Sequence, residues 1–251
     1  MWSEATFERD VQRALERRFA KATVQRIDDV AFSVTPPAPG SAFEVSFHKP
    51  RAACRVDWST CQAEVDRMIA AIDEAMQGAS ARTYAASQLR IALRSRAKLA
   101  KATASLTTRP FSDDAQWVLV ADLPTTVHLT VTSDDHGMSD DAAWQIAVKN
   151  SRPPAFVTAK ADAALVLQGD YAPSALLFPA ELEAAVREHL GNRNGNLLAV
   201  CPEENIVIYT IGGAAEAAAL AQVATAGAKE SQIPLSAVVM EWTSGAWRPV
   251  R

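Results

Sequence analysis

Acidic side chains and a histidine gather in one short stretch of the second half of the chain. Asp134, Asp135 and His136 are followed within five residues by Asp140 and Asp141. Carboxylate oxygens and imidazole nitrogens are donors that suit a divalent cation. Aspartate is also common in turns, and in a first helical turn it stabilises the positive end of the helix dipole. We expect capping as the main role of this stretch, with Asp134, Asp135 and His136 as candidate metal ligands, and we predict no bound cofactor.

Cys201 follows an apolar run at 197–200 and is a candidate nucleophile. A reactive cysteine needs a nearby base that takes its proton. No histidine lies beside Cys201 in the sequence, so a catalytic site would have to assemble from distant residues. The first candidates are His128, His136 and Asp134, and such a site would belong to a small hydrolase-like enzyme. We nevertheless expect a buried thiol at Cys201, because free cysteine packs as a small apolar side chain.

Common catalytic and nucleotide-binding motifs do not occur in this sequence. It contains no Gly-x-Ser-x-Gly elbow, no glycine-rich phosphate loop with a lysine, no dinucleotide fingerprint and no His-Glu-x-x-His. Gly212-Gly213 lies between a predicted strand and a predicted helix, and a helix N-terminus can hold an anion. The missing further glycines and lysine make this a weak indication of an anion site.

Residues 79–112 carry no acidic side chain and form a basic segment. Its cations are Arg82, Arg90, Arg94, Arg96, Lys98, Lys101 and Arg109. A basic surface attracts nucleic acids and anionic proteins, which makes these cations candidate partner-binding residues. The alternative is a connector that rests on the acidic remainder of the chain, with a helix that Leu89, Leu93 and Ala100 allow. Aromatic side chains are scarce here, which argues against a surface for single-stranded nucleic acid.

The composition is that of a globular protein with an acidic balance. Of the 251 residues, 49% are hydrophobic and 22% charged, and the net charge is -4. That charge argues against general affinity for nucleic acid. No apolar run approaches the length of a membrane span, and the charged N-terminus lacks the apolar core of a secretory signal. Three cysteines without such a signal favour reduced thiols, so we expect a cytoplasmic protein.

Apolar periodicity in residues 1–78 predicts a helix-strand-strand-helix unit. The expected elements are a helix over 4–19 capped by Ser3 with Trp2 packed on Phe7, strands over 30–35 and 42–48, and a helix that starts with a Ser59–Gln62 capping box and ends at Gly78. Residues 79–115 are predicted as the basic, partly helical connector. Residues 116–251 are predicted as a second, larger domain.

The second domain is built around the stretch 196–211, in which two apolar runs flank a polar break typical of a hairpin loop. Further strands are expected over 117–123, 127–132, 164–167 and 233–242, and helices from Ser139 to Asn150, from Pro179 to Leu190 and over 214–230. Together these elements predict an α+β fold, with a mixed, mostly antiparallel sheet packed by helices.

Trp242 and Trp247 flank Ser244-Gly245, which reads as the tip of a hairpin. An exposed aromatic pair is typical of interaction surfaces, so both tryptophans are candidate partner-binding residues. The alternative is a cross-strand pair that stabilises the hairpin itself.

Several segments of residues 117–250 resemble the YtpQ-like family, a bacterial domain of unknown function. They are WVLVADL and VHLTVT, a helix that ends in AVKN, GDYAPSALLF, LLAVCPEENIVIYT and the closing EWTSGAWRPV. The resemblance implies an α+β fold and a bacterial, intracellular setting. It implies no mechanism, because the family offers no catalytic residues that can be placed on this sequence.

These observations predict a non-enzymatic protein-interaction module, an adaptor or an immunity-type partner of another bacterial protein. The prediction rests on the missing catalytic motifs, the acidic balance and the separate basic segment. The alternatives are the hydrolase-like enzyme with a site from distant Cys, His and Asp residues, and a nucleic-acid-associated protein that uses the basic segment.

Overall fold

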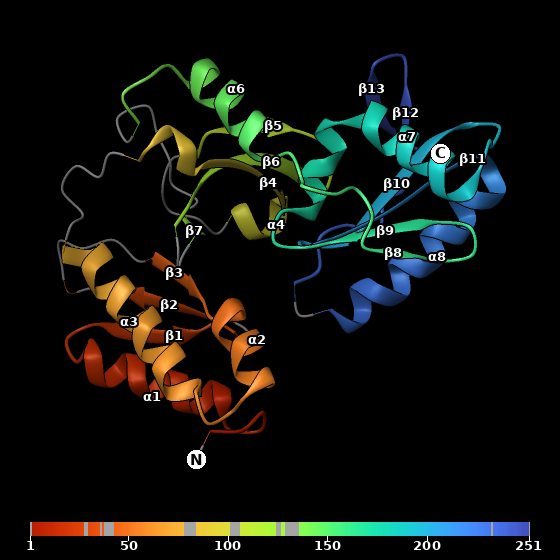
Figure 1. The fold of residues 1–251 in the computed structure, drawn as a ribbon. Coiled ribbons are helices and arrows are strands. Elements are labelled where there is room, and N and C mark those ends of the chain that lie inside the picture. The colour runs from red at the N-terminus through yellow and green to blue at the C-terminus, as the bar shows by residue number, and fades with distance from the viewer. Residues whose placement is uncertain are drawn as a thin grey trace. The chain divides into compact units, whose positions relative to one another are not determined.

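The computed structural model describes the chain from residue 2 to residue 250, except 28–29, 36, 38–42, 78–83, 101–105, 124–126, 129–135 and 232. The chain divides into two compact units. Unit 1 comprises Met1–Thr83 and Asp122–His128, and unit 2 comprises Tyr84–Ala121 and Leu129–Arg251. Both units combine helices with antiparallel strands (Figure 1), which confirms the predicted α+β class.

Unit 1 combines a three-stranded antiparallel sheet with helices. Its main elements are α1 (Phe7–Arg18), β1 (Thr23–Arg26), β2 (Ala31–Thr35), β3 (Phe43–Ser46), α2 (His48–Val56) and α3 (Cys61–Gln77). The strand β2 lies between β1 and β3, and Phe32 stands opposite Val45 in the ladder. Phe7, Leu15 and Phe32 are fully buried in one core that both the helices and the sheet build.

The amphipathic pattern predicted for the first helix is confirmed. Phe7, Val11 and Leu15 recur every four residues, and all three are buried in the core of unit 1. Trp2 packs on Phe7 as predicted, with ring centroids 6.0 Å apart. The predicted cap is wrong, because α1 begins one turn later than expected and Thr6 stands at its N-cap.

Two elements of unit 1 were not predicted, β1 and α2. His48, expected at the end of a strand, is instead the first residue of α2. Pro50 falls in the first turn of that helix, where the missing N–H of proline costs nothing because no carbonyl is available to it. The predicted capping hydroxyl of Ser59 donates to the Asp57 carboxylate instead, and α3 begins at Cys61.

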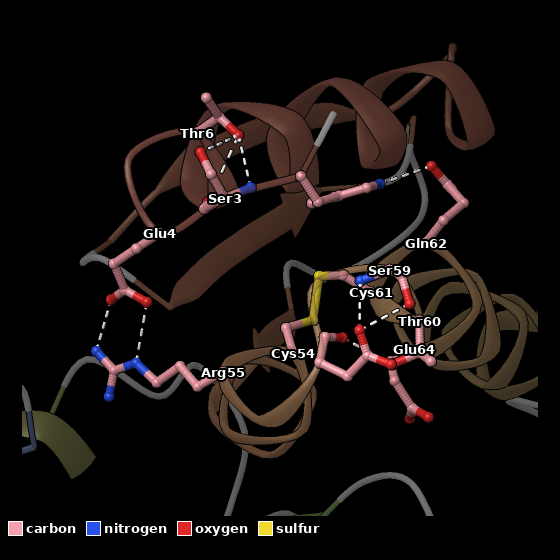
Figure 2. The surroundings of a disulfide bond; sticks show 12 residues. Ser3, Glu4, Thr6, Cys54, Arg55, Ser59, Thr60, Cys61, Gln62 and Glu64 are labelled. Atoms are coloured by element: carbon pink, nitrogen blue, oxygen red, sulfur yellow. Dashed lines mark hydrogen bonds and ion pairs between the residues drawn. A yellow bond between two sulfur atoms is a disulfide. The ribbon is translucent and has the colours of Figure 1, made fainter.

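Cys54 and Cys61 form a disulfide that joins the end of α2 to the start of α3 (Figure 2). Both cysteines are fully buried in the core of unit 1. The prediction of reduced thiols is therefore wrong for this pair, and Cys201 is the free cysteine. A spacing of seven residues does not reveal the Cα–Cα distance, 4.7 Å here, which depends on how the two helices pack.

Unit 2 begins with a small antiparallel sheet. The helices and strands of this part of unit 2 are η1 (Ala86–Gln88), β4 (Leu89–Ser95), α4 (Arg96–Leu99), β5 (Thr108–Pro110), β6 (Ala115–Asp122) and α6 (Asp140–Asn150). The short strand β7 (Val127–His128), which follows β6 in the sequence, belongs to unit 1. The strand β6 lies between β4 and β5. Ser139 accepts a hydrogen bond from the Ala142 N–H at 3.3 Å, so the predicted cap and the predicted end of α6 are both confirmed.

The helix that the basic segment allows around Leu89 and Leu93 is replaced by strand β4, so that expectation is wrong. The strand pairs with β6 along its whole length, from Leu89 opposite Ala121 to Ser95 opposite Ala115. Leu89, Ile91 and Leu93 are all buried. They alternate with Arg90, Ala92 and Arg94, of which both arginines are less completely buried, and this period of two is the pattern of a strand.

A second, six-stranded antiparallel sheet dominates unit 2. Its elements are β8 (Ala159–Lys160), β9 (Leu165–Gln168), η2 (Ala172–Leu177), α7 (Pro179–Leu190), β10 (Asn196–Glu203), β11 (Ile206–Gly212), α8 (Ala214–Glu230), β12 (Met240–Thr243) and β13 (Ala246–Pro249). The strand order is β13-β12-β10-β11-β9-β8. The predicted hairpin is confirmed as β10–β11 at the centre, and α7 and α8 have the predicted bounds.

The hairpin β10–β11 is buried on both faces, as its continuous apolarity predicts. Leu198 and Val200 pack against α8, while Leu197, Ala199 and Tyr209 are buried on the alternate face. Figure 1 shows α7 and α8 on opposite sides of these two strands. The predicted strand over 233–242 is shorter, since only Met240–Thr243 joins the sheet as a named strand. Among the described residues, no helix combines the length and the apolar character needed to cross a membrane.

Candidate functional site

Polar side chains of unit 2 meet where the turn between β10 and β11 faces β4 and α4. We call Arg94, Lys98, Asp114, Glu204 and Ser236 the Glu204 cluster. The Glu204 side chain is only 9% exposed. Its carboxylate lies 3.4 Å from the Arg94 Nε and 3.2 Å from the Lys98 Nζ. A buried carboxylate requires such cationic partners, because burial alone strongly disfavours a charge.

Asp114 forms the second half of the cluster. Its two carboxylate oxygens accept hydrogen bonds from the hydroxyls of Ser112 and Ser236, both at 2.7 Å. The Ser236 hydroxyl also accepts from the Val238 N–H at 3.1 Å. Every hydroxyl and carboxylate named here therefore has an intramolecular partner. Through the Glu204 pairs, the arrangement joins the two sheets of unit 2.

Cys201 lies next to this cluster and is 4% exposed. Burial of the thiol, and secondarily the negative charge of Asp114, raises the pKa of Cys201 well above its usual range. A thiol in this state remains protonated near neutral pH and is a poor nucleophile. The described part of unit 2 gives Cys201 no hydrogen bond to a histidine, and His128 belongs to unit 1.

His136 is 5% exposed and lies just before α6. Its Nδ1 accepts a hydrogen bond from the Met138 N–H at 3.4 Å. Asp134 and Asp135 lie outside the described residues. Asp141 in the first turn of α6 pairs with Arg109 at 2.6 Å, in line with a structural role. No group of three His, Cys, Asp or Glu residues suited to a metal ion occurs in the described ranges.

Most described cations of the basic segment have partners within unit 2. Arg94 and Lys98 pair with Glu204, as given above. Arg90 donates to the carbonyl oxygens of Ser87 and Leu89, at 2.7 and 2.9 Å. Arg109 stacks over the Trp144 ring at 4.4 Å besides pairing with Asp141. Arg96 is exposed, while Arg82 and Lys101 lie outside the described residues.

Trp242 and Trp247 face each other across the β12–β13 hairpin, with ring centroids 5.5 Å apart. The Trp247 Nε1 donates to the Leu176 carbonyl at 2.8 Å, which fastens the hairpin to η2. Both rings are partly buried. The expected turn at Ser244-Gly245 is confirmed, and both residues have the positive φ that such two-residue hairpin turns need. The contacts agree with the cross-strand interpretation of this pair.

The helix N-terminus after Gly212-Gly213 is occupied by the chain itself. The Gly213 N–H donates to the Glu216 carboxylate at 2.9 Å, and this hydrogen bond lowers the pKa of Glu216. A carboxylate at this place satisfies an otherwise unpaired backbone donor. The candidate anion site is therefore filled by a side chain of α8.

The outer face of α8 is a surface feature that the sequence interpretation missed. The exposed residues from Ala214 to Lys229 are Ala214, Ala215, Ala218, Ala219, Gln222, Val223, Thr225, Ala226 and Lys229. Only Lys229 among them is charged, and 53% of Val223 is exposed. By contrast, every exposed residue of α1 is charged. The alanine-rich, charge-poor run over 214–228 was the available signal, but alone it indicates only a helix.

Comparisons with known proteins found no matching family model, no matching curated protein and no matching solved structure. The resemblance to the YtpQ-like family therefore stays a prediction.

Proposed function

We propose that this chain is a non-enzymatic protein-interaction module that binds another protein through the outer face of α8. The observation that carries the proposal is the nearly uncharged, exposed surface from Ala214 to Ala226. A helix on a protein surface ordinarily places charged side chains toward water, as α1 does. Interface cores, in contrast, are depleted of charged residues.

The composition of this face also suits a docking surface. Alanine loses no side-chain entropy when it is buried, so covering this face with a partner costs little conformational entropy. Short side chains let the backbone of a partner helix approach closely, and Val223 supplies a larger apolar contact in the middle. The inner face, with Ala217, Leu220 and Ala224, is already packed on β10 and β11. The outer face is therefore available without unfolding α8.

The proposed partner is a protein with an apolar helical surface, in the manner of an adaptor or an immunity-type pair. The internal pairing of Arg94, Lys98 and Glu204 supports this choice over an anionic partner, because two cations of the basic segment are already engaged. The raised pKa of Cys201 and its burial support a non-enzymatic role over the hydrolase-like alternative.

The test compares two substitutions of the same type, Val223→Glu on α8 and Val56→Glu on α2. Val56 is 88% exposed, so its glutamate variant controls for the added charge. The tagged proteins are incubated in lysate of the host cells, and bound proteins are quantified by mass spectrometry. We expect wild type and Val56→Glu to recover the same partner in similar amounts. Val223→Glu should recover at least about tenfold less of it, because burying the new charge in the interface costs more than the roughly 1.4 kcal/mol that a tenfold change in affinity requires.

Unchanged thermal unfolding midpoints would show that both variants fold. Equal recovery of the partner by all three proteins would contradict binding through α8. Recovery of the tagged protein without any bound partner would contradict the proposed interaction module. Parallel samples with nuclease and with raised salt identify a nucleic-acid link, which both treatments would remove. Light scattering of the purified protein distinguishes self-association from binding of a different chain.

A further inference from the structure

The geometry points to a redox-sensitive set of contacts in unit 1, between residues 2–7 and the corner formed by α2, the 57–60 loop and α3. We call these contacts the clasp. We infer that the Cys54–Cys61 disulfide holds the corner between α2 and α3 in the shape that binds residues 2–7, the N-terminal segment. Reduction of this disulfide releases the segment, while the sheet and the remaining core of unit 1 stay folded.

The first group of contacts in the clasp is ionic. The Glu4 carboxylate accepts hydrogen bonds from two arginines of α2, Arg51 at 2.6 Å and Arg55 at 2.6 and 3.0 Å. Figure 2 shows Glu4 reaching from the N-terminal segment to Arg55, the residue next to Cys54. The Arg51 side chain is only 7% exposed and also stacks over the Phe7 ring. The segment is therefore tied to α2 on both sides of Cys54.

The second group of contacts comes from the loop and from the start of α3. The Trp2 Nε1 donates to the side chain of Gln62 at 2.9 Å, and Gln62 directly follows Cys61. The Trp58 ring meets the Phe7 ring edge-on, with centroids 6.2 Å apart. The N-terminal segment thus depends on side chains of two helices, and the disulfide is the covalent bond that fixes the distance between them.

The rest of unit 1 has its own reasons to stay folded. Leu15, Phe32 and Phe47 share the core of unit 1 with Phe7, but they come from α1, β2 and the residue before α2, and the three-stranded sheet has its own ladder of hydrogen bonds. Residues 2–6 lie before α1 and are held to the unit mainly by the side-chain contacts described above. Losing those contacts therefore opens this segment locally without global unfolding.

The chemistry is thiol–disulfide exchange with a dithiol. One thiolate of the reductant attacks a cysteine sulfur, the S–S bond breaks and a mixed disulfide forms. The second reductant thiol then closes the disulfide of the reductant. Two electrons pass to the protein, and the protons of the reductant end on Cys54 and Cys61. Both cysteines are fully buried, so the attack requires opening of the corner. If the disulfide stabilises the clasp, the contacts of the clasp stabilise the disulfide by the same free energy. Because the reductant can attack only when the corner is open, a weaker clasp exposes the disulfide more often and it is reduced faster.

The test measures how fast dithiothreitol reduces the native, folded protein of 251 residues. Samples are quenched in acid, denatured and alkylated, and intact mass distinguishes one alkylated thiol, Cys201, from three. We expect Glu4→Gln to be reduced at least about threefold faster than wild type, because the variant loses the ion pairs that hold the N-terminal segment on α2, over the disulfide corner. Glu64→Gln is the matched control, since it removes a partly exposed carboxylate of α3 that pairs with Arg67 on the same helix. Equal reduction rates in all three proteins would overturn the clasp.

Hydrogen exchange of oxidised and reduced wild type gives a second readout. Reduction should speed exchange over residues 2–7 and leave 31–35 in unit 1 and 196–212 in unit 2 unchanged. No change over 2–7 would overturn the inference. Equal loss of protection over 2–7 and 31–35 would also overturn it, because the disulfide would then stabilise the whole unit. The variant Cys54→Ser/Cys61→Ser should reproduce the reduced pattern without reductant.

Discussion

The stability that Glu4 contributes to unit 1 depends on pH. Hydrogen bonds from Arg55, and next from Arg51, hold the pKa of Glu4 at about 2, below its ordinary value of 4.5. A carboxylate with a lowered folded-state pKa contributes stability that is present above its unfolded pKa. That stability is lost as the pH falls toward the folded pKa. The relevant window for Glu4 therefore lies between about pH 4.5 and pH 2.

We expect Glu4→Gln to lower the free energy of unfolding by up to about 1 kcal/mol at pH 7, since solvent screens a pair in which Glu4 is nearly half exposed. The difference from wild type should vanish as the pH falls from about 4.5 to 2. Thermal unfolding midpoints of both proteins from pH 7 to pH 2.5 provide the measurement, with Glu64→Gln as control. A difference that does not depend on pH would refute the assignment.

At the residue scale, the sequence indicates what a side chain prefers but not what it meets. The prediction of a buried thiol at Cys201 is confirmed, because apolar flanks report burial directly. The groups around Cys201 come from distant parts of the chain and leave no local pattern. The charge of Asp114 acts on the thiol, and the Ser236 N–H donates to the backbone carbonyl of Cys201. The Cys54–Cys61 disulfide was missed for the same reason, since it depends on helix packing.

At the scale of elements, the confirmed predictions are those for helices whose first residues carry a clear sequence signal. The helices α6 and α7 have a serine cap and a first-turn proline respectively, and both were placed correctly. The strand β4 was misread because Leu89 and Leu93 also fit a helical step of four. Ile91 between them completes a period of two, and pairing with β6 favours that period. A short apolar run is ambiguous until its neighbours in the sheet are known.

Two glycines of unit 2 give opposite predictions for the same substitution. Gly195 has φ +117°, and a Cβ there would lie 2.1 Å from the Gly212 carbonyl oxygen. Gly227 lies within α8, where a Cβ would lie 3.4 Å from the Pro202 side chain, an ordinary contact. We expect Gly195→Ala to destabilise the protein by about 2 kcal/mol or more, through strain and a backbone clash. Gly227→Ala should stabilise it by about 0.5–1 kcal/mol, because alanine is the better helix former.

Thermal unfolding of the two variants beside wild type checks both signs. Hydrogen exchange over 196–212 and 214–230 locates each effect on its own element. Destabilisation by both substitutions would show that α8 lies too close to Pro202 of β10 to accept a methyl group. An unaffected Gly195→Ala protein would contradict the close approach of the two strand ends.

The Glu204 cluster gives an element-scale prediction, since it joins the β10–β11 turn to β4 and α4. Glu204→Gln leaves the Arg94 side chain, which is only 11% exposed, without its charge partner. We expect a loss of about 3 kcal/mol in the free energy of unfolding, as for other broken buried pairs. The control is Glu181→Gln, which breaks the exposed pair with Arg152 and should cost less than about 1 kcal/mol. Equal losses in denaturant unfolding of the two variants would contradict the importance of burial.

At the scale of the whole molecule, the charge balance and the ion pairs bear on the nucleic-acid alternative. The net charge is -4, and Arg94, Lys98 and Arg109 already have carboxylate partners. Binding of a nucleic acid depends on cations that are free to replace the counterions of the phosphates. A cation held by an internal carboxylate must first give up that partner, so the basic segment is a weaker polyanion surface than its composition indicates.

We therefore expect the protein to bind single-stranded DNA with a dissociation constant weaker than about 100 μM at roughly 0.15 M salt, at the weak end of non-specific binding. Fluorescence polarisation of a labelled oligonucleotide measures this, with a salt series from low to physiological strength. Glu204→Gln releases two cations and should bind more tightly at low salt, whereas Glu181→Gln, with the same change in net charge, releases only Arg152. Micromolar binding by wild type with a steep salt dependence would show that the remaining cations suffice, and would revive the nucleic-acid alternative.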